Sequence, residues 1–589
     1  MSSINLNYSL TTAIIVFFLI LSLTTYNRKH LTYKGILTLL IINNMTLLMY
    51  SCYTWDTYIV DYANEAFSLK INTNTWENLP YEISFKINTL SYLFLLLVII
   101  IGFATNIYIL NYFKYEERGE EFILLINWFI FSMIFLVISN TFFTLIIGWE
   151  LIGLSSFLLI NFWKFKTTTL SCSFKAFCFN KVSDLFLILG CAILWNYYKI
   201  NNIDTLLVYV SMNKLDNSVL IYSCTCFLIS ASIKSAQIIG HLWLPDSMEA
   251  PVPASALIHS ATLVSAGIYL ILKFQTLFII SQMMEIIFFV GSLTACFGGL
   301  VAAAQSDMKK LLAYSTISHC GFIMASISLD NFLITIIYLY LHGLFKASTF
   351  FCAGSIIKIN NTQDTRQMGN SNIQVFDTTS LIISTINLGG LPFTFGYLYK
   401  QMFITQLSIT NFSSISIGFC IIGLLTSIVY VYKLIYYSCF DFRKGFLQII
   451  PLIIQNSFLN NIKSLINFTN SKLLSFLIIY LYSILFYIII NFFFLDNYIF
   501  FYYIPEVVTN EYKFFEHYFF LKKYIMSVYY VLFFIICNIL IFNTWRSNFF
   551  YHDSFDIILN LWGFFCSIYL VNGILRYIDN YIFILSVYL

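Results

Sequence analysis

Lysines, histidines and carboxylates lie inside long apolar stretches of this sequence, where charged groups are costly. A charge at the centre of a bilayer costs about 2.5–3.5 kcal/mol on insertion scales. Such residues therefore face the protein interior and have a partner or a task. The candidates are Glu150, Asp184, Lys234, His259, His342, Lys346 and Lys400, with Lys175 as a secondary one because it is nearest the end of its stretch.

Glu150 and Lys234 are the strongest pair of candidates. Glu150 lies between Gly148 and Gly153, which would let a neighbouring helix approach, and Lys234 is flanked by serines and alanines. A lysine that is held between desolvation and a nearby acid can gain and lose a proton. We predict that the two residues are energetically coupled on adjacent spans. The alternatives are a structural ion pair for Glu150 and snorkelling to the interface for Lys234.

Asp184 and the histidines have plainer interpretations beside the functional one. Asp184 follows Lys181 by three positions, so the two can pair on one helix face as an ordinary interfacial pair. An imidazole can hand a proton along, but a lone histidine in an apolar helix is more often a packing residue. His241 and His319 lie near the ends of predicted spans, where we expect a structural role.

The regular placement of the other basic residues favours a pathway. A lateral polar axis with water in its gaps is predicted along Lys234, His259, His342, Lys346 and Lys400.

Composition determines which elements must position these residues. The 589 residues are 59% hydrophobic and only 10% charged, whereas soluble domains carry about 25% charged residues. A span needs roughly 20 apolar residues, and the apolar runs lack the alternation of a β-barrel. The sequence thus predicts an all-α polytopic membrane protein of about fifteen spans. They are 8–26, 35–52, 88–110, 122–138, 140–163, 171–197, 218–240, 251–278, 283–304, 310–328, 331–358, 378–406, 412–439, 470–495 and 518–543.

An internal repeat organises these spans. Phe174–Phe179 resembles Phe345–Phe350, and the next span in each case carries a lysine beside a helix-breaking cluster. The period implies two units of five spans, and an odd number gives them opposite orientations, as in many transporters. Lys and Arg gather in the loops on the side of 27–34, which indicates an outside N-terminus. The predicted regions are 1–121 (N-terminal spans), 122–278 and 283–440 (the two repeats, each with a broken helix) and 441–589 (C-terminal spans, with a lateral amphipathic helix over 552–589).

Motifs for cofactors and metals are missing from the sequence. It has no Cys-x-x-Cys spacing, Gly-rich phosphate loop or His-x-x-x-His pair. The net charge of +3 comes without a basic patch. We therefore expect no cofactor, no metal and no nucleic-acid partner.

The segment Ser235–Val264 resembles the signature of the antiporter-like membrane subunits of respiratory complex I. Gly148–Ser156 and Leu311–Ser318 also match that family, and Phe174–Asp184 is most similar to its distal, longest member. The resemblance implies that Glu150 and Lys234 are a coupled pair with Asp184 nearby. It also implies that His259 relays protons to the second half, where the path continues through His342, Lys346 and Lys400.

This chain departs from the family at three places. The family usually has an acid after the lysine where Gln401 stands, an Asp in place of Asn88, and a Pro where Ile239 stands. The first departure removes an acidic exit partner, and the last leaves the break in that helix to Gly240 and Pro245.

The expected function is that of a non-redox, proton-translocating subunit of an NADH:ubiquinone oxidoreductase, driven by quinone reduction elsewhere in the complex. The expected partners are other membrane-arm subunits, especially a neighbouring antiporter-like one, with lipids, protons and internal water. The A+T-rich codon usage that the composition suggests favours a mitochondrial inner membrane location. The alternatives are a free-standing sodium–proton antiporter subunit and a degenerate scaffold.

Overall fold

The computed structural model describes residues 4–28, 33–54, 65–69, 83–113, 116, 118–212, 217–329, 331–360, 362–368, 375–391, 394–410 and 412–440. All of them belong to one compact unit that spans residues 1–504. Within the described residues, nine helices are long and apolar enough to cross a membrane. The predicted all-α polytopic fold is therefore confirmed. The predicted spans 470–495 and 518–543 and the predicted helix 552–589 lie outside the described residues.

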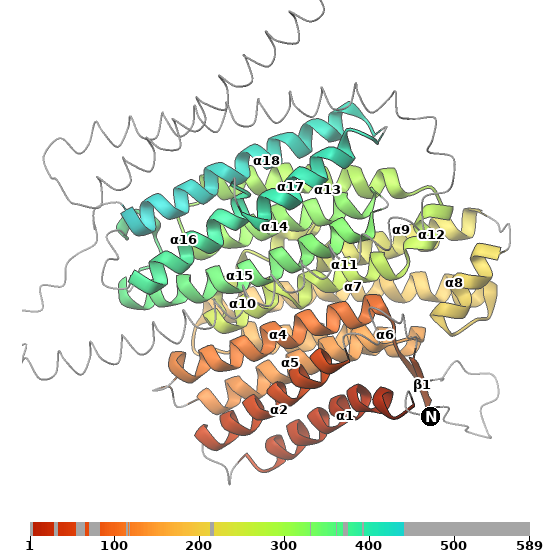
Figure 1. The fold of residues 1–589 in the computed structure, drawn as a ribbon, viewed down its shortest axis with the longest axis horizontal. Coiled ribbons are helices and arrows are strands. Elements are labelled where there is room, and N and C mark those ends of the chain that lie inside the picture. The colour runs from red at the N-terminus through yellow and green to blue at the C-terminus, as the bar shows by residue number, and fades with distance from the viewer. Residues whose placement is uncertain are drawn as a thin grey trace, which may run out of the picture. The chain divides into compact units, whose positions relative to one another are not determined.

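The described part of the N-terminal region comprises helices α1, α2 and α4 and one β-hairpin (Figure 1). Strands β1 and β2 pair antiparallel, with Glu65 opposite Ile87. This hairpin was not predicted, because its strands are much shorter than the apolar runs that indicate membrane spans. Lys86 of the hairpin forms an ion pair with Asp204, at 2.6 Å, and so joins it to a short helix that was also missed. The elements are α1 (Ile4–Tyr26), α2 (Tyr33–Tyr53), β1 (Glu65–Leu69), β2 (Ile83–Ile87), α4 (Thr89–Tyr112) and, later in the chain, α8 (Ile203–Met212).

The helices of residues 119–440 can be divided into two successive sets along the chain, which cover the two predicted repeats. The first set is α5 (Gly119–Ile138), α6 (Phe142–Ile160), α7 (Thr167–Tyr198), α9 (Asn217–Lys234) and the pair α10 (Val252–Ser260) and α11 (Leu263–Lys273), followed by the short α12 (Gln275–Ile280). The second set is α13 (Met284–Ala304), α14 (Met308–Ile327), α15 (Phe332–Asn360), the pair α16 (Val375–Gly389) and α17 (Phe395–Leu407), and α18 (Ser414–Ile435), which ends in a π-helical turn, Tyr436–Phe440.

The span that carries Lys234 is broken, as predicted, but earlier than expected. Helix α9 ends at Lys234 itself, and the chain then continues through Ala236 and Ile239, both with positive φ. Two 3-10 turns follow, Gly240–Trp243 and Asp246–Glu249. The break therefore starts six residues before Gly240, so that Lys234 lies at the open C-terminal end of a half-helix.

The second predicted break separates α16 from α17. Gly390 has φ +67°, a conformation that residues with a Cβ rarely adopt. A Cβ at this position would also lie 2.5 Å from Cδ of Lys400. Glycine is therefore required both by the turn and by the lysine stem that passes over it.

A third break was not predicted. The expected span 251–278 is divided between α10 and α11 at Ala261–Thr262, and Thr262 lies outside the helical region of φ and ψ. This stretch is apolar on both sides of the break, so hydropathy alone gave no sign of it. The break places His259 in the last turn of α10.

Candidate functional site

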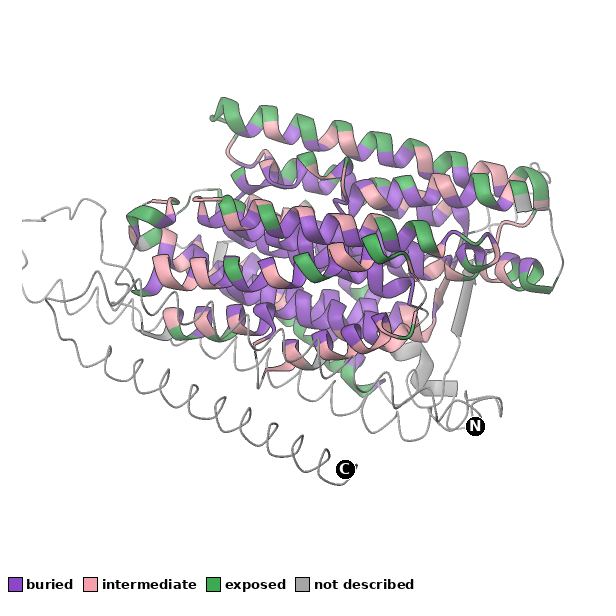
Figure 2. Cartoon of the chain, turned by 90° about the horizontal axis from the view of Figure 1, so that it is seen from above, coloured by how far each residue is buried: buried purple, intermediate pink, exposed green. Residues whose placement is uncertain are grey.

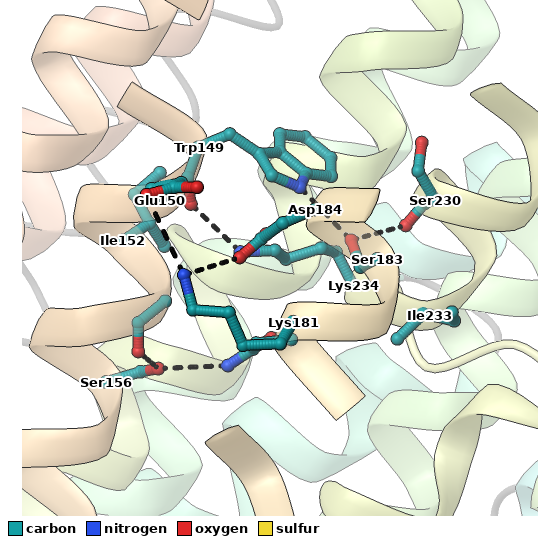
Figure 3. A network of polar contacts seen from close by, with 12 residues as sticks. Trp149, Glu150, Ile152, Ser156, Lys181, Ser183, Asp184, Ser230, Ile233 and Lys234 are labelled. Carbon is teal, nitrogen blue, oxygen red and sulfur yellow. Dashed lines mark hydrogen bonds and ion pairs between the residues drawn. The ribbon is translucent and has the colours of Figure 1, made fainter. Parts of the chain in front are cut away.

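Four charged side chains from α6, α7 and α9 lie together (Figure 3). Asp184 Oδ1 lies 3.7 Å from Lys234 Nζ, and Asp184 Oδ2 lies 3.4 Å from Lys181 Nζ. Lys181 Nζ in turn lies 3.7 Å from Glu150 Oε2. The side chain of Lys181 thus stands between the two carboxylates, and Asp184 stands between the two lysines.

The burial of these four groups differs sharply. The Lys234 and Asp184 side chains are 0% and 5% exposed, whereas those of Glu150 and Lys181 are 47% and 46% exposed. The cluster therefore runs from a fully buried ammonium to an ion pair on the outer face of the described helices.

The backbone of α6 and a serine of α7 hold Lys234 and its neighbours in place. Lys234 Nζ donates to the carbonyl oxygen of Trp149, at 3.0 Å, and lies 5.0 Å from the indole centroid. The indole N–H donates to Ser183 Oγ at 3.1 Å, and that hydroxyl donates to the carbonyl oxygen of Ser230 on α9. These contacts connect the three helices around one lysine.

The predicted Glu150–Lys234 pair is not a direct contact. Among the described residues, no ion pair within 4.0 Å joins these two side chains, and the carboxylate at Lys234 is that of Asp184. The predicted Lys181–Asp184 pair is confirmed. The spacing in the sequence predicts Lys181 only as a partner of Asp184, and no pattern there indicates its second contact with Glu150.

Lys175 lies apart from this cluster. Its Nζ forms an ion pair with Asp246, at 2.6 Å, which joins α7 to the second 3-10 turn after the break. Both side chains are partly exposed. The contact stabilises the broken segment, and Lys175 does not reach the buried axis.

His259 lies between the two repeats. Its Nε2 contacts Ser247 Oγ at 3.1 Å, and its ring stacks on Phe350 of α15 with centroids 5.4 Å apart. The side chain is fully buried, and its Nδ1 has no hydrogen-bond partner in the described part of the chain. A fully buried histidine that contacts both sets of helices fits the predicted position between the halves.

Lys346 and His342 lie one turn apart on α15, and both are buried. Lys346 Nζ donates to Ser315 Oγ at 2.5 Å and to the carbonyl oxygen of Leu312 at 3.3 Å, both on α14. Among the described residues no carboxylate lies within 4.0 Å of Lys346. A hydroxyl and a backbone carbonyl solvate it instead.

Lys400 has a similar environment on α17. Its Nζ donates to the carbonyl oxygen of Gly389 and to Ser427 Oγ, both at 2.6 Å. In the part that the structure describes, it has no carboxylate within 4.0 Å, consistent with Gln401 in place of the family's acid.

The expected place of His319 is wrong. It lies in the middle of α14, fully buried, and not near the end of a span. Its two ring nitrogens contact the hydroxyls of Tyr338 and Tyr430. The predicted span 310–328 itself has residue 319 near its middle, so the expectation of a span end did not agree with that span.

Lys234, His259, His319, Lys346 and Lys400 each contact a hydroxyl group or a backbone carbonyl. Such groups can pass protons if water or side-chain motion joins them. Within the described residues, no group of three His, Cys, Asp or Glu side chains is suited to hold a metal ion.

Residues 139–428 match the family described as NADH:quinone oxidoreductase/Mrp antiporter, TM. The chain is 43% identical over 375 residues to NADH-ubiquinone oxidoreductase chain 5 of Paramecium tetraurelia, covering 62% of this chain and 65% of that one. It is 35% identical over 423 residues to the chain 5 of Wickerhamomyces canadensis, covering 70% and 64%. The chain thus spans less than two thirds of the length of these relatives, and the predicted resemblance is confirmed.

Two solved structures share the fold. One is the Mrp complex from Dietzia sp. DQ12-45-1b, with a TM-score of 0.66, 23% identity, and coverage of 79% of this chain and 49% of that chain. The other is the membrane-bound sulfane sulfur reductase, an archaeal respiratory membrane complex, with a TM-score of 0.65, 16% identity, and coverage of 79% and 96%.

Proposed function

We propose that this chain is a proton-translocating membrane subunit of a respiratory NADH:ubiquinone oxidoreductase. The observation that carries the proposal is the burial of three lysines, Lys234, Lys346 and Lys400, which are 0%, 0% and 4% exposed. Burying an ammonium inside a membrane protein costs free energy. A lysine in such a position therefore indicates a functional site. The names of the similar proteins give the reaction that would drive it.

The buried lysines would act by taking up and releasing protons. Lys234 has Asp184 as its counter-ion, and Asp184 also contacts Lys181. A shift of Asp184 toward Lys181 would weaken its hold on the Lys234 ammonium and favour proton release. Each proton that crosses the membrane works against about 2.3 kcal/mol per 100 mV. Rearranging a contact of this kind changes the free energy of proton binding to the lysine by several times about 1.4 kcal/mol. That change is large enough to drive a proton across the membrane against this potential.

The chain would take no part in the redox chemistry. We infer that quinone reduction in another subunit supplies the energy, and that this chain binds neither NADH nor a redox centre. Its place would be the mitochondrial inner membrane, as a multi-pass subunit of the membrane arm.

A sodium–proton antiporter subunit is the second candidate, because the Mrp complex shares the fold. That likeness is at 23% identity, whereas the chain 5 relatives reach 43%. Purification of the chain from native membranes distinguishes the two functions. Flavin and iron–sulfur subunits should accompany it, and their absence would favour the antiporter.

Replacing Lys346 by methionine should lower the number of protons moved per NADH oxidised, because methionine keeps the buried volume but cannot carry a proton. We expect proton translocation through this chain to fall on the order of 100-fold, which is the contribution of one positioned proton-transferring side chain. The measurement is proton translocation in sealed membrane vesicles that contain the whole complex. The control is Lys310→Met, which removes a half-exposed lysine in the first turn of α14. Unchanged stoichiometry in Lys346→Met would contradict the proposal.

The outer face of α6 and α7 is our proposed contact with a neighbouring membrane subunit. It carries the half-exposed Glu150–Lys181 ion pair among exposed apolar side chains. In the described helices as a whole, exposed residues (green in Figure 2) lie along the outermost helices of the view, whereas the helices between them are mostly buried. An exposed charge pair in the middle of a span is costly against lipid, so a protein surface should cover it. The apolar members include Leu151, Leu154, Phe174, Val182 and Leu185.

Glu150→Lys should reduce assembly of this subunit into the complex. It would place a second ammonium beside Lys181, and two like charges cannot be desolvated together at low cost. The measurement is the amount of chain in the intact complex on native gels. Glu285→Lys reverses an exposed acid at the start of α13 and should assemble normally. Equal assembly of both variants would refute the contact.

A further inference from the structure

His319 is a fully buried basic residue that the proposed pathway leaves unused. It lies in α14 and is 0% exposed. The centroid of its ring lies 5.6 Å from that of His342. Among the described residues no carboxylate pairs with it. A buried histidine in this position can be a packing residue only. Its hydrogen-bond contacts therefore indicate whether it has a further role.

Both ring nitrogens of His319 face hydroxyl groups. Nδ1 contacts the hydroxyl of Tyr338 on α15, and Nε2 contacts the hydroxyl of Tyr430 on α18, at 2.9 Å. In the neutral ring one nitrogen donates and the other accepts. The imidazole therefore forms a hydrogen-bonded bridge from α15 across α14 to α18.

Each end of this bridge leads toward a buried lysine. On α15, Tyr338, His342 and Lys346 follow at intervals of four residues and so share one helix face. On α18, Tyr430 lies three residues after Ser427, whose hydroxyl accepts from Lys400 Nζ at 2.6 Å.

We propose that His319 carries the proton that passes between Lys346 and Lys400. The proposal rests on the proposed function, and it assigns the connection between its two second-half lysines to one residue. The alternative, a packing histidine, needs neither two hydroxyl partners nor their alignment with two lysines.

The transfer is balanced and needs no redox partner. The Lys346 ammonium first releases a proton in the direction of His342 and Tyr338. The Tyr338 hydroxyl takes up this proton and at the same time passes its own proton to Nδ1 of His319. The resulting imidazolium releases the proton from Nε2 to the Tyr430 hydroxyl.

Tyr430 in turn passes its own proton toward Ser427 and the neutral Lys400 amine. Lys346 has then lost one proton and Lys400 has gained one. His319 is neutral again with its proton on the other nitrogen, and the reverse shift along the same hydroxyls restores it.

The test is His319→Gln in the intact complex. Glutamine can still donate to one tyrosine and accept from the other, but it cannot be protonated. Proton passage through this chain should fall on the order of 100-fold, and this is measured as fewer protons moved per NADH oxidised in sealed vesicles. A merely structural change would reduce the amount of complex and leave this ratio unchanged.

Tyr430→Phe keeps the test decisive if His319→Gln does not assemble, because it removes one hydroxyl and keeps the ring. It should lower the same ratio. The matched controls are His241→Gln, on the 3-10 turn after α9, and Tyr432→Phe, two residues along α18. Both controls should keep the normal ratio.

Lys400→Met distinguishes a failure of the His319 proposal from a failure of the proposed function. If Lys400→Met lowers the ratio and both His319→Gln and Tyr430→Phe keep it, the His319 proposal is overturned and the proposed function stands. If Lys400→Met also keeps the ratio, the proposed function itself fails, and the role of His319 fails with it.

Discussion

Asp184→Asn should lower proton translocation roughly tenfold or more, and more strongly than Glu150→Gln. Asp184, not Glu150, lies within 4.0 Å of the buried Lys234. Removing one partner of a buried ion pair costs about 3–5 kcal/mol, because the remaining charge is left uncompensated. Glu150 is half-exposed and contacts only Lys181 in the cluster. The measurement is the number of protons moved per NADH oxidised in vesicles that contain the assembled complex.

The control for this comparison is Asp246→Asn, which removes the partner of Lys175 at a partly exposed pair. It should affect assembly slightly and leave the proton stoichiometry unchanged. A larger loss in Glu150→Gln than in Asp184→Asn would show that the direct Asp184–Lys234 contact is not the functional one.

Gly390→Ala should cause a clear loss of both stability and function. The residue has φ +67°, and a left-handed conformation costs a residue with a Cβ about 1–2 kcal/mol. The new methyl would also lie 2.5 Å from Cδ of Lys400. Displacing that stem moves Nζ away from Gly389 and Ser427. We expect lower thermal stability of the purified complex together with a lower proton stoichiometry.

Gly418→Ala is the matched control for Gly390→Ala. It lies within α18, and a Cβ there meets no heavy atom within 4 Å. Replacing glycine by alanine inside a helix adds about 1 kcal/mol of stability. The two variants should therefore change the melting temperature in opposite directions. The same sign in both would refute the role of Gly390.

The spans and the buried lysines were predictable from the sequence because both depend on local composition. An apolar run of sufficient length forms a helix in lipid, since every backbone group must be paired there. Lys234, Lys346 and Lys400 stand out in such runs, and the Gly389–Gly390 pair indicates a break without any knowledge of the fold.

The contacts between helices were not predictable in the same way. Asp184 and Glu150 are both acids inside spans, and only the packing of α7 against α9 shows which one reaches Lys234. His319 acquires its two hydroxyl partners from helices that are far from it in the sequence. The break before α11 lies at Ala261–Thr262, where no Gly or Pro in the sequence indicates a helix end.

The interrupted helix at Lys400 also places a partial negative charge beside the lysine ammonium. Helix α16 ends at Gly389, and its last carbonyl accepts directly from the Lys400 ammonium. The carbonyl end of a helix carries roughly half a negative charge from its aligned peptide dipoles. That fractional charge is fixed in the backbone and cannot be neutralised by a proton, as a carboxylate can. Among the described residues no acid lies within 4.0 Å of Lys400 to compete for its proton. With Gln401 in place of an acid, the charge that faces the Lys400 ammonium there is therefore the constant one of the helix end.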